Sequence, residues 1–427
     1  MIRIFKCKDV SDEEIFARSL PTASVEGAVS EIIACVKEKK DAALLDYTEK
    51  FDGVRLSSLL VTEEELSFAV SKVEPEFLRI LEEAAENIRR FHEKQLRTSF
   101  ILNEQDGVVM GQKITPVDRA GLYVPGGTAA YPSTVLMDAI PAKIAGVREV
   151  CMVTPPSKDG SVNPAILAAA RVAGIDRIYK VGGAQAIAAL AYGTESIPRV
   201  DKIVGPGNAY VAEAKRQVYG EVSIDMIAGP SEILIVADGK SNARHLAADL
   251  LSQAEHDKMA SAVLVTDSAE LAEKVQAELE RQIPLLPRNE IARYSIDTNG
   301  KIIVAASILE AIEISNRLAP EHLELCVEDP FALLDKVKHA GSIFMGRYCP
   351  EALGDYLAGP NHTLPTGGSA RFSSPLSVDD FVKKTQYTYY TRDALCRVAK
   401  DVAFFAEKEG LSAHARSALA RLEEEQQ

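Results

Sequence analysis

Apolar side chains recur at helical spacing in the first hundred residues of the chain. From about residue 22 to residue 52 they include Val36 and Leu44, and Gly53 ends the run. A second stripe of this kind extends from about residue 75 to residue 96. Both patterns predict amphipathic helices that bury one face.

Beyond this region, short apolar segments alternate with helical patterns. The segments are GLYVPGG (121–127), EVCMVTPP (149–156), RIYKVGGAQA (177–186), KIVGPGNAY (202–210), EILIVAD (232–238), AVLVTD (262–267), KIIVAAS (301–307) and GSIFMG (341–346). Such alternation is typical of parallel sheets flanked by helices. It predicts an α/β fold of two Rossmann-like, incomplete and duplicated parallel-sheet domains, with helical N-terminal and C-terminal extensions.

We expect four parts along the chain. They are an N-terminal arm (1–22), a discontinuous first α/β domain (23–122 plus 233–376), a second α/β domain (123–232) and a C-terminal helical extension (377–427). The final stretch, LSAHARSALARLEEEQQ, has too narrow an apolar stripe to form its own core. This extension must therefore pack on something else.

Length and charge narrow the class of partner. At 427 residues the chain is too long for one hydrophobic core, and 62 acidic against 48 basic residues give a net charge of -14. This balance argues against nucleic acid and anionic lipid as partners and favours small molecules. The sequence shows neither a signal peptide nor a membrane span, and its six cysteines are scattered singly. We expect a cytoplasmic protein with reduced thiols.

Two glycine-bearing turns lie between a predicted strand and a helix, where backbone amides would meet a pyrophosphate. They contain Gly182 and Gly183, and Gly205 to Gly207. Neither is a GxGxxG fingerprint, and a plain tight turn is the more ordinary interpretation. Taken alone, these turns do not establish a nicotinamide cofactor.

Several side chains offer ligands for a metal ion. Gln253 and His256 are three residues apart, so they share one face near a helix end. Asp355, before a Gly-Pro turn, and His414, close to Glu409, are further candidates, although each alone is more often a turn or surface residue. A mixed nitrogen and oxygen set of this kind suits zinc, manganese or cobalt.

Glu321 and His322 form a candidate acid–base pair. They follow Ala319-Pro320, which should end the preceding helix, and an adjacent carboxylate and imidazole can move protons near neutral pH. For an arbitrary Glu-His pair, capping of the next strand is the commoner role. Cys151 lies within an apolar strand and is interpreted as a core thiol.

Longer motifs connect these signals. Residues 224–256, IDMIAGPSEILIVADGKSNARHLAADLLSQAEH, resemble the signature of the histidinol dehydrogenase family almost without a break. Further matches are GLYVPGG (121–127), VGGAQAIAALAYGT (181–194), VGPGNAYVAEAK (204–215), RLAPEHLEL (317–325), GDYLAGPNHTLPTGGSARF (354–372) and EGLSAHA (409–415). The resemblance covers nearly the whole chain.

The resemblance implies roles for individual residues. The family's metal ligands fall on Gln253, His256, Asp355 and His414, and its catalytic pair falls on Glu321 and His322. Its substrate contacts fall on Ser231, Gln253, His256, His322, Asp355, His362, Glu409 and His414. Its NAD contacts fall on Tyr123, Gln185 and Asn208, which assigns NAD binding to the second α/β domain.

The resemblance also implies a reaction and an assembly. NAD would oxidise L-histidinol through the aldehyde to L-histidine, the last step of histidine biosynthesis. One Zn2+ per subunit would anchor the substrate, with His322 as base and Glu321 activating water. A homodimer would exchange its C-terminal segments, so that Glu409 and His414 reach the partner's site.

Other functions fit parts of the pattern. A related zinc- and NAD-dependent dehydrogenase would act on another amino alcohol. A zinc hydrolase would use the same Glu-His pair to cleave an amide or ester. A two-lobed solute-binding protein would be non-catalytic. Production of NADH from L-histidinol separates these interpretations.

Overall fold

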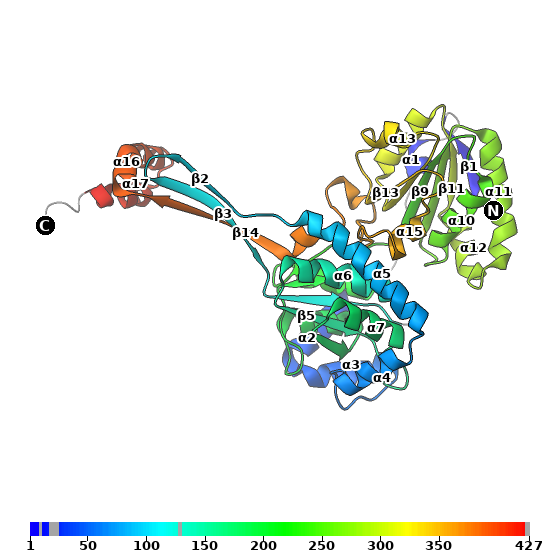
Figure 1. Cartoon of the computed structure of the whole chain (residues 1–427), viewed down its shortest axis with the longest axis horizontal. Helices are drawn as coiled ribbons and strands as arrows, with labels where there is room; N and C mark the ends of the chain where they lie inside the picture. The colour runs from blue at the N-terminus through cyan, green and yellow to red at the C-terminus, as the bar shows by residue number, and fades with distance from the viewer. Residues whose placement is uncertain (8–10, 17–24, 127–129, 423–427) are drawn as a thin grey trace. The chain divides into compact units, whose positions relative to one another are not determined.

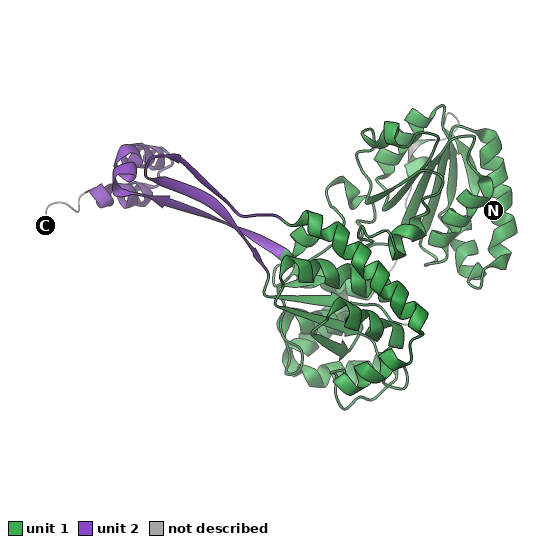
Figure 2. Cartoon of the chain, in the orientation of Figure 1, with its two compact units in different colours: residues 1–96, 117–381 green, residues 97–116, 382–427 purple. Residues whose placement is uncertain are grey.

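The computed structural model describes residues 1–7, 11–16, 25–126 and 130–422. They form two compact units (Figure 2). Unit 1 comprises Met1–Leu96 and Val117–Phe381, and unit 2 comprises Arg97–Pro116 and Val382–Gln427. Unit 1 contains two parallel sheets, and the predicted α/β class is confirmed.

The first parallel sheet has five strands in the order β6-β5-β4-β7-β8. The strands are β4 (Arg119–Tyr123), β5 (Glu149–Thr154), β6 (Arg177–Lys180), β7 (Lys202–Val204) and β8 (Ser223–Ile224). The connecting helices are α6 (Pro132–Ala145), α7 (Pro164–Ala173), α8 (Gly183–Tyr192) and α9 (Ala209–Val218). Leu122 and Tyr123 enter two different apolar clusters, so both faces of the sheet are buried.

The predicted N-terminal helices cover this same sheet (Figure 1). They are α2 (Glu26–Lys39), α3 (Asp41–Asp52), α4 (Glu63–Ser71) and α5 (Pro75–His92), followed by the 3-10 turn η1 (Glu93–Gln95). Lys40, with φ 49°, separates α2 from α3 within the single helix that we expected. The expected first domain joined residues 23–122 to 233–376. That grouping differs from the observed packing, because these helices and β4 belong with the five-stranded sheet.

The second parallel sheet has six strands in the order β1-β11-β10-β9-β12-β13. The strands are β1 (Arg3–Lys6), β9 (Glu232–Ala237), β10 (Ser261–Thr266), β11 (Lys301–Val304), β12 (His322–Cys326) and β13 (Ser342–Met345). Part of the expected N-terminal arm is thus an edge strand, and the rest of that arm includes residues 8–10 and 17–22, outside the described residues.

Helices cover both faces of the six-stranded sheet (Figure 1). One face carries α10 (Ala243–Ala254), α11 (Ala269–Gln282), η2 (Ile283–Leu285) and α12 (Asn289–Thr298). The other carries α1 (Asp12–Phe16), α13 (Ile308–Leu318) and α14 (Phe331–Leu334). After β13 come α15 (Glu351–Tyr356), η3 (Ser369–Arg371) and η4 (Val378–Phe381).

Unit 2 is an antiparallel sheet with two helices. Its strand order is β14-β3-β2, formed by β2 (Phe100–Gln105), β3 (Val108–Pro116) and β14 (Val382–Tyr390). α16 (Arg392–Lys408), α17 (Ser412–Leu419) and η5 (Ala420–Leu422) follow. The C-terminal extension (377–427) was expected to be mostly helical. Residues 382–390 instead pair with β3 and form a strand.

Two further predictions can be checked on the fold. All six cysteines are free thiols, as their single spacing indicated. Among the described residues, no helix combines the length and the apolar character that a bilayer span requires.

Candidate active site

A cavity of about 1350 Å³ opens within unit 1 and is lined by both parallel sheets. The five-stranded sheet contributes residues that follow its strands, among them Pro125, Gly205 and Asn208. The six-stranded sheet contributes residues that begin its strands, among them Glu232 and His322. The carboxyl ends of one sheet and the amino ends of the other therefore line the same cavity.

Glu321 and His322 lie at the amino end of β12, on the wall of this cavity. The helix before them ends at Ala319 in the left-handed region, and Pro320 cannot continue it, so the chain turns directly into the strand. Both side chains are buried, at 7% and 4% exposed. The predicted boundary position of this pair is confirmed.

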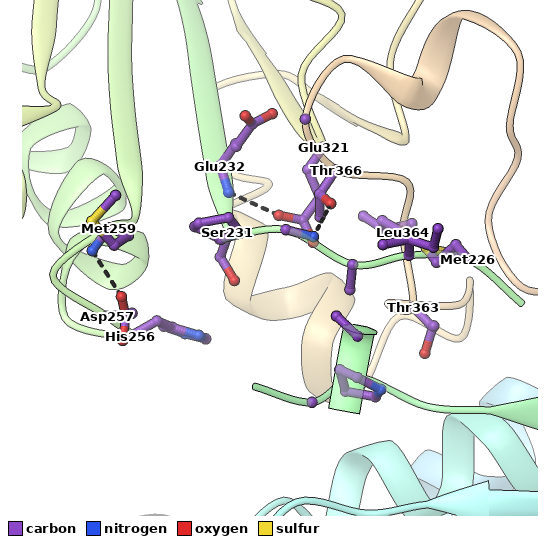
Figure 3. A pocket seen from close by; sticks show the side chains of 18 of the residues that line it. Met226, Ser231, Glu232, His256, Asp257, Met259, Glu321, Thr363, Leu364 and Thr366 are labelled. Atoms are coloured by element: carbon purple, nitrogen blue, oxygen red, sulfur yellow. Dashed lines mark hydrogen bonds between the residues drawn. The ribbon is translucent and has the colours of Figure 1, made fainter. Parts of the chain in front are cut away.

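The first residue of β9 fixes the pair. The backbone N–H of Glu232 donates to Oε2 of Glu321 at 2.8 Å (Figure 3), and Nδ1 of His322 lies 3.0 Å from the Glu232 carbonyl. Because a carbonyl only accepts, Nδ1 donates this hydrogen bond. In the neutral ring the lone pair is then on Nε2, which is buried and has no hydrogen-bond partner among the described residues.

Two carboxylates of α15 stand next to this ring nitrogen. Nε2 of His322 is 3.8 Å from Oε1 of Glu351 and 4.0 Å from Oδ1 of Asp355. One ligand atom from each of these three residues lies within 4.8 Å of the others. Glu351 was not predicted from the sequence, although its spacing of one helical turn from Asp355 was a usable signal.

The charges in this group perturb one another. Burial opposes the charge on His322, but the carboxylates of Glu321, Glu351 and Asp355 outweigh it and raise its pKa to about 10. Burial and the Asp355 charge raise the pKa of Glu351 to about 7. Burial would also raise the pKa of Asp355, yet the neighbouring His362 and His322 hold it well below its usual range.

The donor atoms around Asp355 fit a divalent cation. Gln253, at the last turn of α10, is 1% exposed, and its Oε1 has no hydrogen-bond partner in the described part of the chain. His256 follows the same helix and lines the cavity, with its pKa lowered by burial. A buried amide oxygen without a donor, in a cavity that imidazoles and carboxylates also line, is the chemistry of a zinc-type ligand set.

His362 connects Asp355 to the five-stranded sheet. Its Nδ1 is 3.6 Å from Oδ1 of Asp355, and its Nε2 is 3.3 Å from the Thr134 hydroxyl at the start of α6. Burial lowers the pKa of His362, but the hydrogen bond and charge of Asp355 raise it by more. The pKa of His362 is therefore above its usual value. Ser231, immediately before β9, also lines the cavity.

The three residues predicted to contact NAD have different surroundings. Asn208 lines the cavity and caps α9. Its side chain accepts hydrogen bonds from the backbone amides of Tyr210 and Val211. Tyr123 and Gln185 are buried, at 4% and 2% exposed, outside the cavity lining. The Tyr123 hydroxyl accepts a hydrogen bond from the Gly183 amide at 3.1 Å, so Tyr123 holds the turn before α8 in place.

The remaining predicted site residues lie in unit 2. Glu409 follows α16 and His414 is on α17, and both are exposed. The residues that line the cavity belong to unit 1. Cys151 is fully buried, and burial raises the pKa of its thiol to about 12, which confirms that it is a core residue.

Comparison with known proteins identifies the family. Residues 17–422 match the family model of histidinol dehydrogenase. The chain is 59% identical to a histidinol dehydrogenase of Bacillus cereus over 402 residues, which cover 94% of each protein. It is 55% identical to that of Clostridium acetobutylicum over 422 residues, or 98% of each.

The chain belongs to the histidinol dehydrogenase family. A crystal structure of histidinol dehydrogenase from Elizabethkingia anophelis agrees with this fold at a TM-score of 0.94 and 39% identity, covering 99% of this chain and 98% of that one. Membership in the family explains why one cavity gathers an acid–base pair, a set of metal-type donors and turns after parallel strands.

Proposed function

We propose that the protein is a zinc- and NAD-dependent histidinol dehydrogenase that oxidises L-histidinol through the aldehyde to L-histidine. The observation that carries this proposal is the position of His322. His322 lines the cavity together with Gln253, His256 and Asp355, and its Nε2 has no hydrogen-bond partner among the described residues. Family membership supports the same activity.

His322 is assigned the role of general base. Because Nδ1 donates to the Glu232 carbonyl, Nε2 is the atom that accepts the hydroxyl proton of the substrate as hydride leaves for NAD. The same atom acts again in the second oxidation. The surrounding carboxylates stabilise the protonated ring after each transfer.

Gln253, His256 and Asp355 would hold the metal in this subunit. When bound, zinc would supply Lewis-acid anchoring of L-histidinol and would offset part of the negative charge of the carboxylates around His322. His362 would orient Asp355 from the opposite side and contact the substrate. Ser231 would provide a further polar contact from the wall of the cavity.

Glu321 is assigned to water activation between the two oxidations. Its Oε2 accepts from the Glu232 amide, which fixes the carboxylate and leaves Oε1 to take a proton from water. Hydration of the aldehyde gives a second alcohol, from which hydride and proton leave as in the first step. The adjacent positions of Glu321 and His322 let one pocket serve both.

NAD binding is assigned to the five-stranded sheet and its turns. Tyr123, Gln185 and Asn208 are the proposed contacts, and Asn208 and Ala209, at the start of α9, line the cavity. Residues that follow the carboxyl ends of β4 and β7 line the cavity. Nucleotide ligands bind at this position in open parallel sheets.

The complete site is proposed to form in a homodimer. Glu409 and His414, which belong to unit 2, would come from the partner subunit, as the resemblance to the family implies. Unit 2 exposes an unusual number of large apolar side chains: Phe100, Ile101, Leu102, Met110, Tyr387, Tyr389, Tyr390, Val402, Phe404, Phe405 and Leu411. A surface of this kind favours burial against another copy. A cytoplasmic location stays a prediction.

Complementation tests the shared site. Subunits carrying His322→Asn and subunits carrying His414→Asn are each expected to be inactive alone. In a mixed dimer with exchanged segments, one of the two sites has both native histidines, so random mixing should restore about a quarter of the native activity. No activity in a mixture that contains mixed dimers would contradict the exchange.

Substrate selection tests the function itself. The purified zinc-loaded protein should form NADH from L-histidinol, and L-phenylalaninol, which lacks ring nitrogens, should give at least about a hundredfold lower kcat/KM. Equal activity on both amino alcohols would indicate a related dehydrogenase. No NADH from either would contradict the proposed function.

A further inference from the structure

The segment that carries His362 is pinned to α6 by buried hydrogen bonds. Asn361 donates from Nδ2 to the Met137 carbonyl at 2.6 Å and accepts from the Thr363 amide at 2.8 Å. The Thr363 hydroxyl donates to Oδ1 of Asp138 at 3.0 Å. Asn361 and Thr363 are 4% and 7% exposed, and Asp138 is fully buried. The residues on both sides of His362 are therefore fixed.

Asp138 also lies beside the turn that follows β7. A Cβ atom added to Gly205 would come within 3.1 Å of Oδ2 of Asp138. The Gly205 amide donates to Asp225 at 2.8 Å, and the Gly205 carbonyl accepts from Nζ of Lys215 at 2.9 Å. Lys215 and Asp225 form a buried ion pair. One buried cluster thus touches both the Gly205 turn and the His362 segment.

We propose that Asp138 and Thr363 are positioning residues that hold His362 at the distance from Asp355 needed to bind the substrate. Neither is assigned a chemical step, and Asp138 does not line the cavity. The inference rests on the proposed function, in which His362 contacts L-histidinol. Substrate affinity would then depend on the hydrogen bond between Thr363, which lines the cavity, and Asp138, which does not.

The electrostatics of the cluster agree with this role. Burial and the charge of Asp225 raise the pKa of Asp138 to about 7, whereas His362, the Thr363 hydroxyl and Lys215 act in the opposite direction. Oδ1 of Asp138 accepts a hydrogen bond from the Thr363 hydroxyl. Oδ2 of Asp138 has no hydrogen-bond donor among the described residues. Losing that donor leaves a fully buried carboxyl without any hydrogen bond, so the segment must shift.

Thr363→Val is the decisive variant, because valine has nearly the same shape and lacks the hydroxyl. We expect the KM for L-histidinol to rise about five- to tenfold, which is the effect of one lost buried hydrogen bond, with kcat and the KM for NAD within about twofold of native values. Thr363→Ser keeps the hydroxyl and should restore the native KM. Ser161→Ala, which removes an exposed hydroxyl from Asp159, is the matched control and should change nothing.

The interaction between the two residues is measured by a double-mutant cycle. If they act through one hydrogen bond, Asp138→Ala and Thr363→Val together should raise the KM for L-histidinol no further than Asp138→Ala alone. Calorimetric binding of L-histidinol to the zinc-loaded protein without NAD should show the same change in Kd. Zinc content should stay native in every variant.

The outcomes separate the two proposals. A native protein that forms no NADH from L-histidinol overturns the proposed function. If the native protein forms NADH from L-histidinol and the Thr363→Val variant has an unchanged KM and Kd, only the positioning role is overturned. A parallel loss of kcat, NAD affinity and zinc would also overturn it, because general distortion of the fold would then explain the effect.

Discussion

The two parallel sheets of unit 1 use opposite edges to build one cavity. The five-stranded sheet contributes its carboxyl ends, where Gly205 and Pro206 form a turn and Asn208 begins a helix. The six-stranded sheet contributes its amino ends, where the titratable side chains of Glu321 and His322 line the cavity. We therefore propose that similar architecture serves two tasks: the first edge would bind the cofactor, and the second would transfer protons.

This division predicts where mutations act. Changes at the amino ends of the six-stranded sheet should lower kcat, and changes at the carboxyl ends of the five-stranded sheet should raise the KM for NAD. A variant at the amino ends of the six-stranded sheet that raised only the KM for NAD, or a variant at the carboxyl ends of the five-stranded sheet that lowered only kcat, would contradict this division.

The largest effect is expected at His322. His322→Asn removes the base at Nε2 and should lower kcat by about a thousandfold, with both KM values changed little. Steady-state kinetics with each substrate varied measures this. His245 is an exposed histidine on α10, which covers the same sheet. His245→Asn is therefore the control and should have native kcat and KM values. A kcat reduced less than about tenfold would place the base elsewhere.

A smaller and more selective effect is expected at Glu321. Glu321→Gln keeps an acceptor for the Glu232 amide but cannot take a proton from water, so oxidation of supplied histidinaldehyde should fall about a hundredfold. The first oxidation, followed in a single turnover from L-histidinol, should stay within a few-fold of native. Equal losses in both half-reactions are incompatible with the assigned role.

Gly205 tests the opposite edge. It has φ +116°, and a Cβ atom there would meet the Tyr123 carbonyl at 2.1 Å, so alanine must displace the turn beside Asn208. We expect Gly205→Ala to raise the KM for NAD about tenfold, with less effect on L-histidinol binding. Gly220→Ala is a matched control, because Gly220 has φ +105° but free space at the Cβ position. Equal effects of both would mean that backbone strain alone is responsible.

The smallest effect concerns pH. Asp52, at the end of α3, has its pKa raised by burial to about 6, so the folded state holds its proton more tightly than the unfolded chain does. Native stability from this group is present at low pH and is lost as pH rises from about 4 to about 6. Asp52→Asn should therefore gain thermal stability relative to native protein across this window, by roughly 1 to 3 °C for this half-exposed group.

The sign of that pH effect has its own control. Asp159 is exposed, and hydrogen bonds from Ser161 lower the pKa of its carboxyl. Asp159→Asn should show no gain over the same window. A difference between Asp52→Asn and native protein that shrinks as pH rises would contradict the burial of Asp52.

Local patterns predicted the elements well. Alternating apolar segments located β4 to β7, β9 to β11 and β13, and Pro320 placed Glu321 and His322 at an element boundary. Gln253, His256 and Asp355 were predicted as metal ligands from ligand chemistry and spacing, and all three line the cavity, but their role as ligands stays a prediction. These signals are local, because strand character, helix ends and ligand spacing depend on neighbours in sequence.

Long-range pairing was harder to predict. The strand β14 reads as part of a polar tail, and only pairing with β3, far away in sequence, makes it extended. Likewise, nothing in α2 to α5 reveals which sheet they cover, since an amphipathic stripe fits any apolar face. Glu351 was missed for the same reason: its relevance depends on α15 lying beside β12.

We propose that one pocket, with one base and one water-activating carboxylate, performs two oxidations. The number of NADH molecules formed per L-histidinol consumed by the zinc-loaded protein in excess NAD, with the product identified, tests this. We expect two NADH and L-histidine, with no aldehyde released. One NADH with free aldehyde would show that the pocket performs only the first oxidation.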